Sequence, residues 1–192
     1  MDAMDPRALY ETPNAGRLMP SLDESFDGVV LLGHHAKAGT RNGFLDHTWS
    51  SASWFEYRIN DCNVGEIAIE AAWAAHYGVP VVAVSGDAAT AAEARELLGR
   101  VETATVKWAI GRNRAKCLPL PRAHEEIASA LRRAVASIGE FKPWTPALPA
   151  VAQLTLYRSD MADDLARRVG MERVDARTVR CTVDSLLHIN PF

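Results

Sequence analysis

The chain has 192 residues, of which 48% are apolar and 23% are charged, a composition typical of an ordinary globular protein with one core. Its 21 Lys and Arg against 24 Asp and Glu give a formal net charge of −3, which lacks the basic excess of a nucleic-acid-binding domain. The three cysteines are odd in number and widely spaced, which argues against a disulfide framework and favours a reducing cytoplasm.

The amino-terminal segment, residues 1–25, is expected to be irregular because prolines and Gly16 interrupt any periodic pattern. It has neither the basic start nor the apolar stretch of a secretion signal. No run in the chain reaches the roughly 18 apolar residues of a membrane span. We therefore expect a cytoplasmic protein with no membrane segment.

The first regular elements are predicted by short apolar patterns. Residues 28–33 (GVVLLG) form a continuous apolar run, which predicts a strand buried on both faces, as in a parallel sheet. A second strand is expected over 48–59. The alanine-rich segment 64–77 has apolar side chains at helical spacing and is followed by Gly78, which predicts a helix that ends there.

The elements that follow alternate in type. An apolar run predicts a buried strand over 79–86, and Asp87 is expected to cap the next helix. Apolar residues at three- and four-residue intervals predict a long helix over 122–141. The remaining expected elements are a helix at 88–99, a strand at 101–110, a strand at 151–158, a helix at 159–170 and a strand at 176–183.

Strands that alternate with helices favour an α/β fold, with a mainly parallel central sheet flanked by helices and a smaller carboxyl-terminal α+β portion. We expect the α/β core over 1–141, a proline-rich connection over 142–150 and the smaller portion over 151–192. In open sheets of this kind, sites form in loops beyond the carboxyl ends of strands. The segment HHAKAGT, which directly follows GVVLLG, is such a loop.

Three histidines in this region, His34, His35 and His47, are candidate zinc ligands, because zinc accepts neutral imidazole nitrogen together with carboxylate oxygen. A loop histidine is also commonly a solvated or hydrogen-bonded surface group. His34 and His35 are adjacent and would point to opposite sides of an extended chain, so at most one of them is expected to face a site.

The nearest carboxylate that a fold could return to this loop is Glu66, but its spacing also fits a capping box in which Asn63 caps a helix and Glu66 bonds back to the backbone. Asp46 could orient the imidazole of His47, although sequence neighbours rarely have the geometry for it. Spacing alone favours the cap for Glu66.

A basic cluster follows the expected strand at 101–110. Its members could bind a substrate carboxylate through paired donors, or they could form a solvated loop. The cluster comprises Lys107, Arg112, Arg114 and Lys116. The sequence contains no HExxH, GxSxG, P-loop or GxGxxG pattern.

Several of these segments, in order, resemble the DppA-type D-aminopeptidases, a family of binuclear-zinc, self-compartmentalising peptidases. The resemblance is carried by DESFDGVVLLGHHAKAGT, FLDHTWSS, NVGEIAIEAAWAAHYGVPVVAVSGD and VETATVKWAIGRNRAKCLPLP. It runs from about residue 5 to residue 145 and is densest over 23–121. It is specific because the motifs occur in order at family-like spacing.

The resemblance implies roles for four residues. The zinc-binding histidine of the family's G-[YH]-H-A motif falls on His35, and its zinc-binding glutamate falls on Glu66. The histidine regarded as catalytic falls on His47, and Lys107 lies in a segment near the family's active site, which implies contact with substrate. The implied substrates are short peptides with an amino-terminal D-residue, D-alanine being the family type, and the implied assembly is a ten-subunit ring.

The sequence departs from the family at its start. Family members begin with S-x-D-x-E-G and N-D-[SA]-H motifs, which supply three further zinc ligands, and neither motif occurs here. Two ligands do not make a catalytic zinc site, which normally takes three, so we expect a binuclear centre to need residues that this chain does not supply. Two alternatives stay open: a non-catalytic remnant that oligomerises or binds a small molecule, and a metal-dependent amidohydrolase that acts on another amide.

Overall fold

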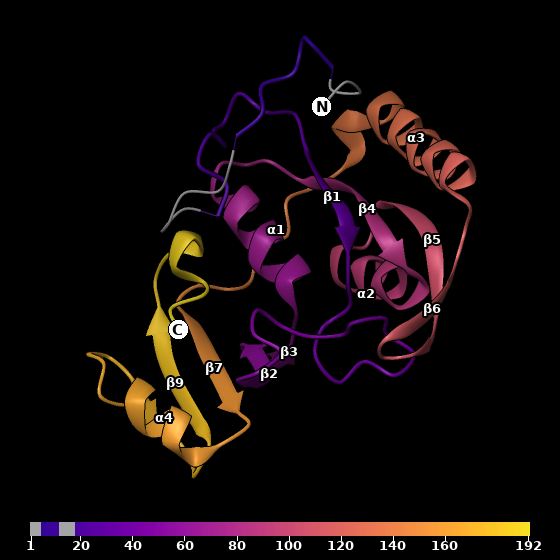
Figure 1. Ribbon diagram of the computed structural model, residues 1–192. Helices are drawn as coiled ribbons and strands as arrows, with labels where there is room; N and C mark the ends of the chain where they lie inside the picture. The colour runs from indigo at the N-terminus through magenta and orange to yellow at the C-terminus, as the bar shows by residue number, and fades with distance from the viewer. Residues whose placement is uncertain (1–4, 12–17) are drawn as a thin grey trace.

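The computed structural model describes residues 5–11 and 18–192, which form two sheets with helices packed around and between them (Figure 1). The first sheet has the order β1-β4-β5-β6 and the second the order β3-β2-β7-β9-β8. The strands of the first sheet are β1 (Val29–His34), β4 (Val81–Asp87), β5 (Glu102–Gly111) and β6 (Arg114–Cys117). Those of the second are β2 (Trp54–Ile59), β3 (Cys62–Asn63), β7 (Ala150–Leu156), β8 (Glu172–Arg173) and β9 (Thr178–Val183).

Four α-helices accompany the sheets. They are α1 (Glu66–His76), α2 (Ala88–Leu98), α3 (Leu120–Ala136) and α4 (Ser159–Leu165), with short 3-10 turns at Ile138–Glu140 and Leu186–His188. Within the described ranges, no helix is both long enough and apolar enough to cross a membrane.

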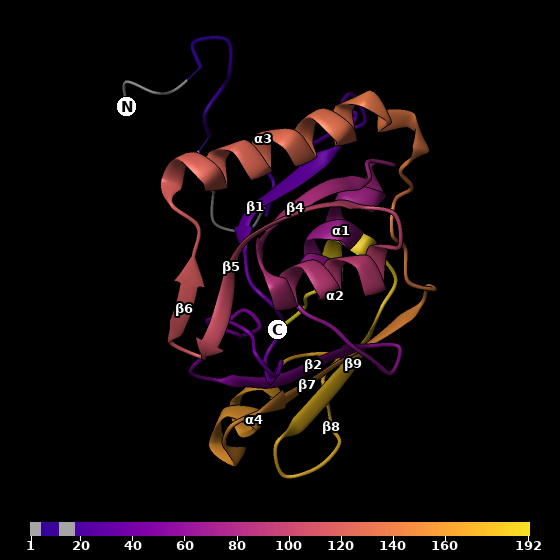
Figure 2. The ribbon, with the colours of Figure 1, turned by 90° about the vertical axis from the view of Figure 1, so that its right-hand side faces the viewer.

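The first sheet is parallel across β1, β4 and β5, and only β6 runs antiparallel. Figure 2 shows α3 on one side of this sheet and α1 and α2 on the other. Every residue of β4 is buried, as expected of a central strand covered on both faces. The α/β fold with a mainly parallel, helix-flanked sheet is therefore confirmed.

The helix α1 lies in the middle of the molecule and contributes to two apolar clusters. Ala68, Ala72 and Trp73 pack against the second sheet, whereas Ile67 and Ala71 pack against β1 and β4 of the first. This helix is buried over most of its surface, with Glu66 and Glu70 on its one polar side, and small alanine side chains let the surrounding elements approach it closely. The alanine-rich composition of this segment follows from that position.

The second sheet joins segments that are far apart in the sequence. β2 comes from the first third of the chain and pairs antiparallel with β7, which begins at Ala150. The side chain of Asn60 reinforces this junction: its amide nitrogen donates to the Ala147 carbonyl at 2.8 Å, and its oxygen accepts from the Val151 N–H at 2.8 Å. The carboxyl-terminal strands thus complete a sheet that β2 and β3 begin.

The prediction that the first strand is buried on both faces is wrong. β1 lies at the edge of its sheet, and the side chains of Val30 and Leu32 are 41% and 66% exposed. The reason is the position of α3, which packs over β4 and β5 rather than over β1. Only the face of β1 that carries Leu31 is covered.

Other boundaries and connections also differ from the sequence patterns. The predicted helix at 122–141 ends at Ala136 and is followed by a 3-10 turn. The basic segment that follows β5 forms the strand β6, which pairs with β5, instead of a loop. The predicted cap is confirmed, because the Asp87 carboxylate accepts the Thr90 N–H at 2.8 Å.

Enlarging the buried face of α1 tests its central position. We expect Ala72→Leu to lower the free energy of unfolding by about 1–3 kcal/mol, because Ala72 is fully buried and extra methylene groups force the packed side chains apart. The control is Ala92→Leu at an exposed position of α2, for which a change within about 0.5 kcal/mol is expected. Urea unfolding measures the stability of both variants, and an equal loss of stability in the two would contradict the buried, central position of α1.

Candidate metal centre

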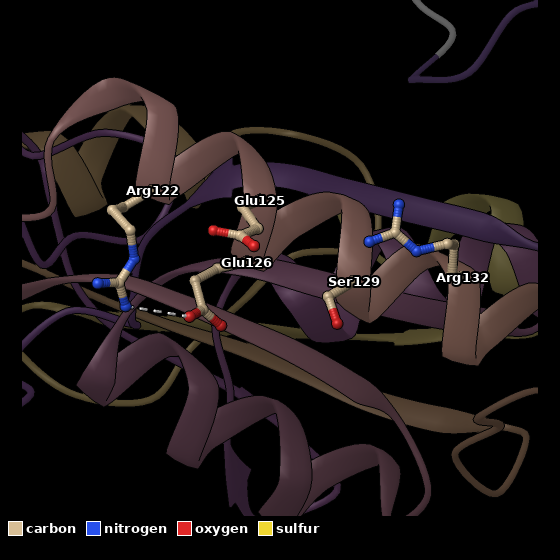
Figure 3. Close-up of a pocket in the computed structure, with 5 residues that line it drawn as sticks. All are labelled: Arg122, Glu125, Glu126, Ser129 and Arg132. Carbon is tan, nitrogen blue, oxygen red and sulfur yellow. Dashed lines mark ion pairs between the residues drawn. The ribbon is translucent and has the colours of Figure 1, made fainter.

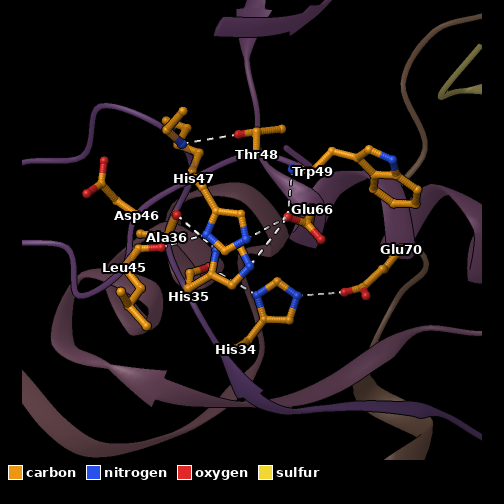
Figure 4. A network of polar contacts seen from close by, with 12 residues as sticks. His34, His35, Ala36, Leu45, Asp46, His47, Thr48, Trp49, Glu66 and Glu70 are labelled. Carbon is orange, nitrogen blue, oxygen red and sulfur yellow. Dashed lines mark hydrogen bonds and ion pairs between the residues drawn. The ribbon is translucent and has the colours of Figure 1, made fainter. Parts of the chain in front are cut away.

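Two imidazoles and one carboxylate converge where β1, the loop after it and the start of α1 meet (Figure 4). His35 Nε2 lies 3.4 Å and His47 Nε2 lies 3.8 Å from the same Glu66 oxygen, Oε1. The three potential ligand atoms lie within 4.8 Å of one another. Among the described residues, this is the one group of three or more His, Cys, Asp or Glu side chains with metal-binding spacing.

Backbone carbonyls fix the orientation of both imidazoles. His35 Nδ1 is 3.2 Å from the Ala36 carbonyl oxygen, and His47 Nδ1 is 2.6 Å from the Leu45 carbonyl oxygen. A carbonyl oxygen can only accept a hydrogen bond, so each Nδ1 carries the proton. Each Nε2 is therefore the nitrogen that faces Glu66, and it has a free lone pair when the ring is neutral.

The backbone and the stacking of the rings hold the group together. The His47 N–H donates to the Ala36 carbonyl at 3.2 Å, which joins the two histidine segments. The imidazoles of His35 and His47 stack with centroids 3.7 Å apart. The Trp49 N–H donates to Glu66 Oε1 at 2.8 Å, which ties the carboxylate to the loop. The arrangement is thus built from main-chain contacts as well as side chains.

The donor set fits a zinc ion. Neutral imidazole nitrogens and a carboxylate oxygen repel one another, so they need a proton or a cation between them. Ligand atoms of a tetrahedral zinc ion with bonds near 2.0–2.1 Å lie about 3.3 Å apart. The separations of 3.4 and 3.8 Å are close to that value, and both ligand types, imidazole nitrogen and carboxylate oxygen, are ones that zinc accepts.

The surroundings of Glu66 favour the ionised carboxylate that a metal requires. Burial alone would raise the pKa of Glu66, but three effects outweigh it: a hydrogen bond from Nε2–H of His35 when that ring is protonated, the hydrogen bond from the Trp49 N–H, and the positive charge of protonated His35 and His47. The pKa of Glu66 is therefore below its ordinary value, and the group is negatively charged at neutral pH.

The capping-box prediction for Glu66 is wrong. The residue before α1 is Gly65, which makes no side-chain cap, and Asn63 belongs to β3, where it pairs with Arg58. The Glu66 carboxylate is engaged by Trp49 and the imidazoles, so it does not bond back to Asn63. Its charge is nonetheless favourable at the start of a helix.

The suggestion that Asp46 orients His47 is also wrong. Its carboxylate accepts the Gly39 N–H at 2.8 Å and pairs with Arg112 at 3.5 Å, and Figure 4 shows it turned away from the imidazoles. The carbonyl of Leu45 orients His47 instead. No side-chain pattern in the sequence could reveal a backbone acceptor.

The residues that flank His47 have an unusual backbone. Leu45 has φ +54° and Trp49 has φ +57°, the left-handed region that bulky side chains rarely adopt. This conformation turns the Leu45 carbonyl toward His47 and the Trp49 N–H toward Glu66. Backbone strain of this kind is concentrated at functional sites.

The structure places Lys107 beside this loop but outside the three-residue group. Lys107 is in β5, and its Nζ lies 5.2 Å from the ring centroid of Phe44. The Phe44 N–H donates to the Asp87 carboxylate at 2.6 Å, which fixes the loop against the end of β4. The other basic residues diverge: Arg112 pairs with Asp46, whereas Arg114 and Lys116 are in β6.

His34, the residue before His35, has a different partner, Glu70. His34 Nε2 is 2.8 Å from Glu70 Oε2, and its Nδ1 is 3.0 Å from the His35 carbonyl oxygen. Burial would lower the pKa of His34, but the hydrogen bond and charge of Glu70 outweigh it and raise the pKa. Glu70 was missed at the sequence level, although it lies four residues after Glu66 and so on the same face of α1.

A shallow hollow elsewhere offers no comparable chemistry. Its lining side chains all come from the single helix α3 and point outward, with an ion pair of 3.8 Å between Arg122 and Glu126 (Figure 3). The other lining residues are Glu125, Ser129 and Arg132. None of its five lining residues is a candidate ligand, catalytic or substrate-binding residue.

Comparison with known proteins gives three consistent matches. The sequence profile of a family described as D-aminopeptidase matches residues 5–191. A D-aminopeptidase of Bacillus subtilis (strain 168) is 38% identical over 129 residues, which are 67% of this chain and 46% of that protein. The chain thus spans about half the length of this relative.

A solved structure is also similar. It is described as the Zn-dependent D-aminopeptidase DppA from Bacillus subtilis, a self-compartmentalizing protease. The TM-score is 0.83 at 32% sequence identity, over 88% of this chain and 61% of that chain. The likeness therefore extends to both sheets of the fold but not to the full length of the solved protein.

Replacement of Leu45 tests the left-handed backbone. We expect Leu45→Gly to be more stable than Leu45→Ala by about 0.5–1 kcal/mol, because only glycine adopts this φ without strain. Val151, a partly exposed strand residue of β7, provides the control, where glycine is expected to be less stable than alanine by a similar amount. Urea unfolding of the four variants measures the difference in unfolding free energy between glycine and alanine at each position. If glycine were the less stable of the two at both positions, the proposed backbone strain at Leu45 would be contradicted.

Proposed function

Because this chain belongs to the D-aminopeptidase family, we propose that it is a zinc-dependent aminopeptidase that hydrolyses short peptides with an amino-terminal D-amino acid, of the D-alanyl type. The observation that carries the proposal is the convergence of His35 Nε2 and His47 Nε2 on the Glu66 carboxylate. The similar solved protein is described as Zn-dependent, which supports the choice of metal.

In this proposal, His35 and Glu66 are the zinc ligands. Both are about one-fifth exposed, and the carboxylate is held by the Trp49 N–H before a metal arrives. Zinc, when bound, supplies Lewis acidity that polarises a peptide carbonyl and activates water. The ligands are positioned by a strand end and a helix start, which are rigid elements compared with a free loop.

His47 is the proposed catalytic residue. Its side chain is 28% exposed, more than that of His35, and its Nδ1–H is fixed by the Leu45 carbonyl. Nε2 is thus the atom that takes a proton from the attacking water and returns it to the departing amine nitrogen. In its protonated state, the same N–H can stabilise negative charge on the carbonyl oxygen.

Lys107 is proposed to bind the carboxylate of a short substrate. Its ammonium group lies against the Phe44 ring rather than in an ion pair with a described side chain, so it keeps donors for an incoming anion. The loop that carries His47 includes Phe44, which places Lys107 next to the catalytic segment. A short peptide would then be held at both ends.

Self-association is proposed as well. The similar solved protein is described as self-compartmentalizing, which supports assembly of this chain into a closed particle, with the decamer of the family as the expected size. The exposed apolar side chains of Val30 and Leu32 on β1 are suited to burial between subunits. We propose a cytoplasmic location for this assembly.

A second candidate is a protein of the same fold that binds a ligand or assembles without catalysis. It is favoured by the count of metal ligands, since the described residues provide a single group of three and the family is binuclear. The two candidates differ in turnover, which the next two experiments measure.

Zinc content and turnover test the ligand assignment. If the first candidate is right, the purified 192-residue protein holds zinc and hydrolyses D-alanyl-p-nitroanilide, and Glu66→Gln loses both, because it removes the anionic ligand. The matched control is Glu125→Gln, an exposed carboxylate on α3, which is expected to keep both. Zinc without turnover in the unaltered protein would favour the second candidate, and zinc retained in Glu66→Gln would contradict the ligand role.

Substitution of His47 separates catalysis from metal binding. We expect His47→Gln to reduce kcat by about 10²–10⁴-fold while zinc is retained, because the imidazole is proposed to transfer protons and not to hold the metal. Elemental analysis and turnover on the same sample measure both effects. Loss of zinc together with activity would instead identify His47 as the third ligand of the group.

A further inference from the structure

A buried carboxylate on α2, which the proposed reaction does not use, contacts both segments that carry the zinc ligands. The side chain of Glu93 is only 7% exposed. Its Oε2 accepts the Lys37 N–H at 2.7 Å. Its Oε1 has no hydrogen-bond partner among the described atoms.

The unpartnered oxygen lies against the chain just before α1. A Cβ atom added to Gly65 would come within 2.8 Å of Glu93 Oε1 and within 2.8 Å of Lys37 Cβ. The φ of Gly65 is −114°, which any residue can adopt. Gly65 is therefore required for the close approach of Glu93 and Lys37, and not for its dihedral angles.

These contacts connect the two ligand-bearing segments directly. Lys37 is two residues after His35, and Gly65 immediately precedes Glu66. The carboxyl group of Glu93 thus lies against both the loop that follows β1 and the residue before α1, where these two segments also meet each other. A change in its length or position is therefore expected to shift the two segments relative to one another.

Burial of this carboxyl group is costly. Burial raises the pKa of Glu93, against the opposing effects of the Lys37 N–H and of nearby positive charge. A buried polar group with an unmet hydrogen bond is unfavourable by about 1–3 kcal/mol. An apolar side chain would avoid that cost but could not accept the Lys37 N–H.

We propose that Glu93 is a positioning residue that fixes His35 and Glu66 at the separation needed for zinc. The inference rests on the proposed metal centre but concerns a residue outside it. Because Glu93 acts through Lys37 and Gly65, it holds the ligands in place and touches neither metal nor substrate.

Zinc affinity and amide exchange together test this role. We expect Glu93→Ala to weaken zinc binding, measured by competition with a chelator, by about 10–100-fold, the range seen when outer-shell partners of metal ligands are removed. In the metal-free protein, the Lys37 amide is expected to exchange with deuterium faster than in the unaltered chain. Glu93→Gln keeps an acceptor of the same length and is expected to restore both values.

Two controls separate positioning from general stability. Glu96→Ala removes an exposed carboxylate from the same helix and is expected to change neither value. Val82→Ala lowers stability in the cluster between β4 and α3, away from the ligands, and is expected to lower Tm without changing the zinc affinity. Glu93→Asp, whose shorter side chain cannot span both contacts, replaces Glu93→Ala if that variant does not fold.

The outcomes are distinguishable. Unchanged zinc affinity in Glu93→Ala, or an equal loss in Val82→Ala, would overturn the positioning role. If the unaltered protein bound no zinc, the proposed function would fail, and the exchange measurement alone would then decide on Glu93. Faster exchange at Lys37 in Glu93→Ala would support the connection between the segments, and unchanged exchange would overturn it.

Discussion

Two hydrogen bonds from imidazole to main-chain carbonyl determine what this site can do. The carbonyls of Ala36 and Leu45 hold the Nδ1 protons of His35 and His47, and so direct both Nε2 atoms toward Glu66. The result is a cluster of acceptors, which is stable only around a proton or a cation. Carbonyl contacts of this kind are the usual means by which proteins select the metal-binding nitrogen of histidine.

The rest of the fold maintains the distance between these groups. Glu66 begins α1, which packs against both sheets, so the position of the carboxylate depends on the antiparallel sheet as well as on the parallel one. The loop that carries His35 and His47 is fixed by two carboxylates. Asp87 accepts the Phe44 N–H, and Glu93 accepts the Lys37 N–H. The start of α2 and a residue in its middle therefore both contribute to the same loop.

The sequence predicted features that depend on local pattern. Continuous apolar runs, helical periodicity and the Asp87 cap indicated the alternation of strands and helices, and the resemblance brought His35, His47 and Glu66 forward as one site. Features that depend on distant neighbours could not be predicted in this way. The exposed face of β1 follows from the placement of α3, and the missing Asn63 cap follows from the contact between Trp49 and Glu66.

The most direct test of the central claim is a nitrogen NMR measurement of the histidine rings, made on the protein with and without one equivalent of zinc. The tautomers imposed by Ala36 and Leu45 predict that Nδ1 of His35 and His47 carries a proton in both samples. They further predict that zinc shifts the Nε2 signal of His35. Zinc that bound through Nδ1, or that shifted only histidine rings outside this site, would contradict the preformed site.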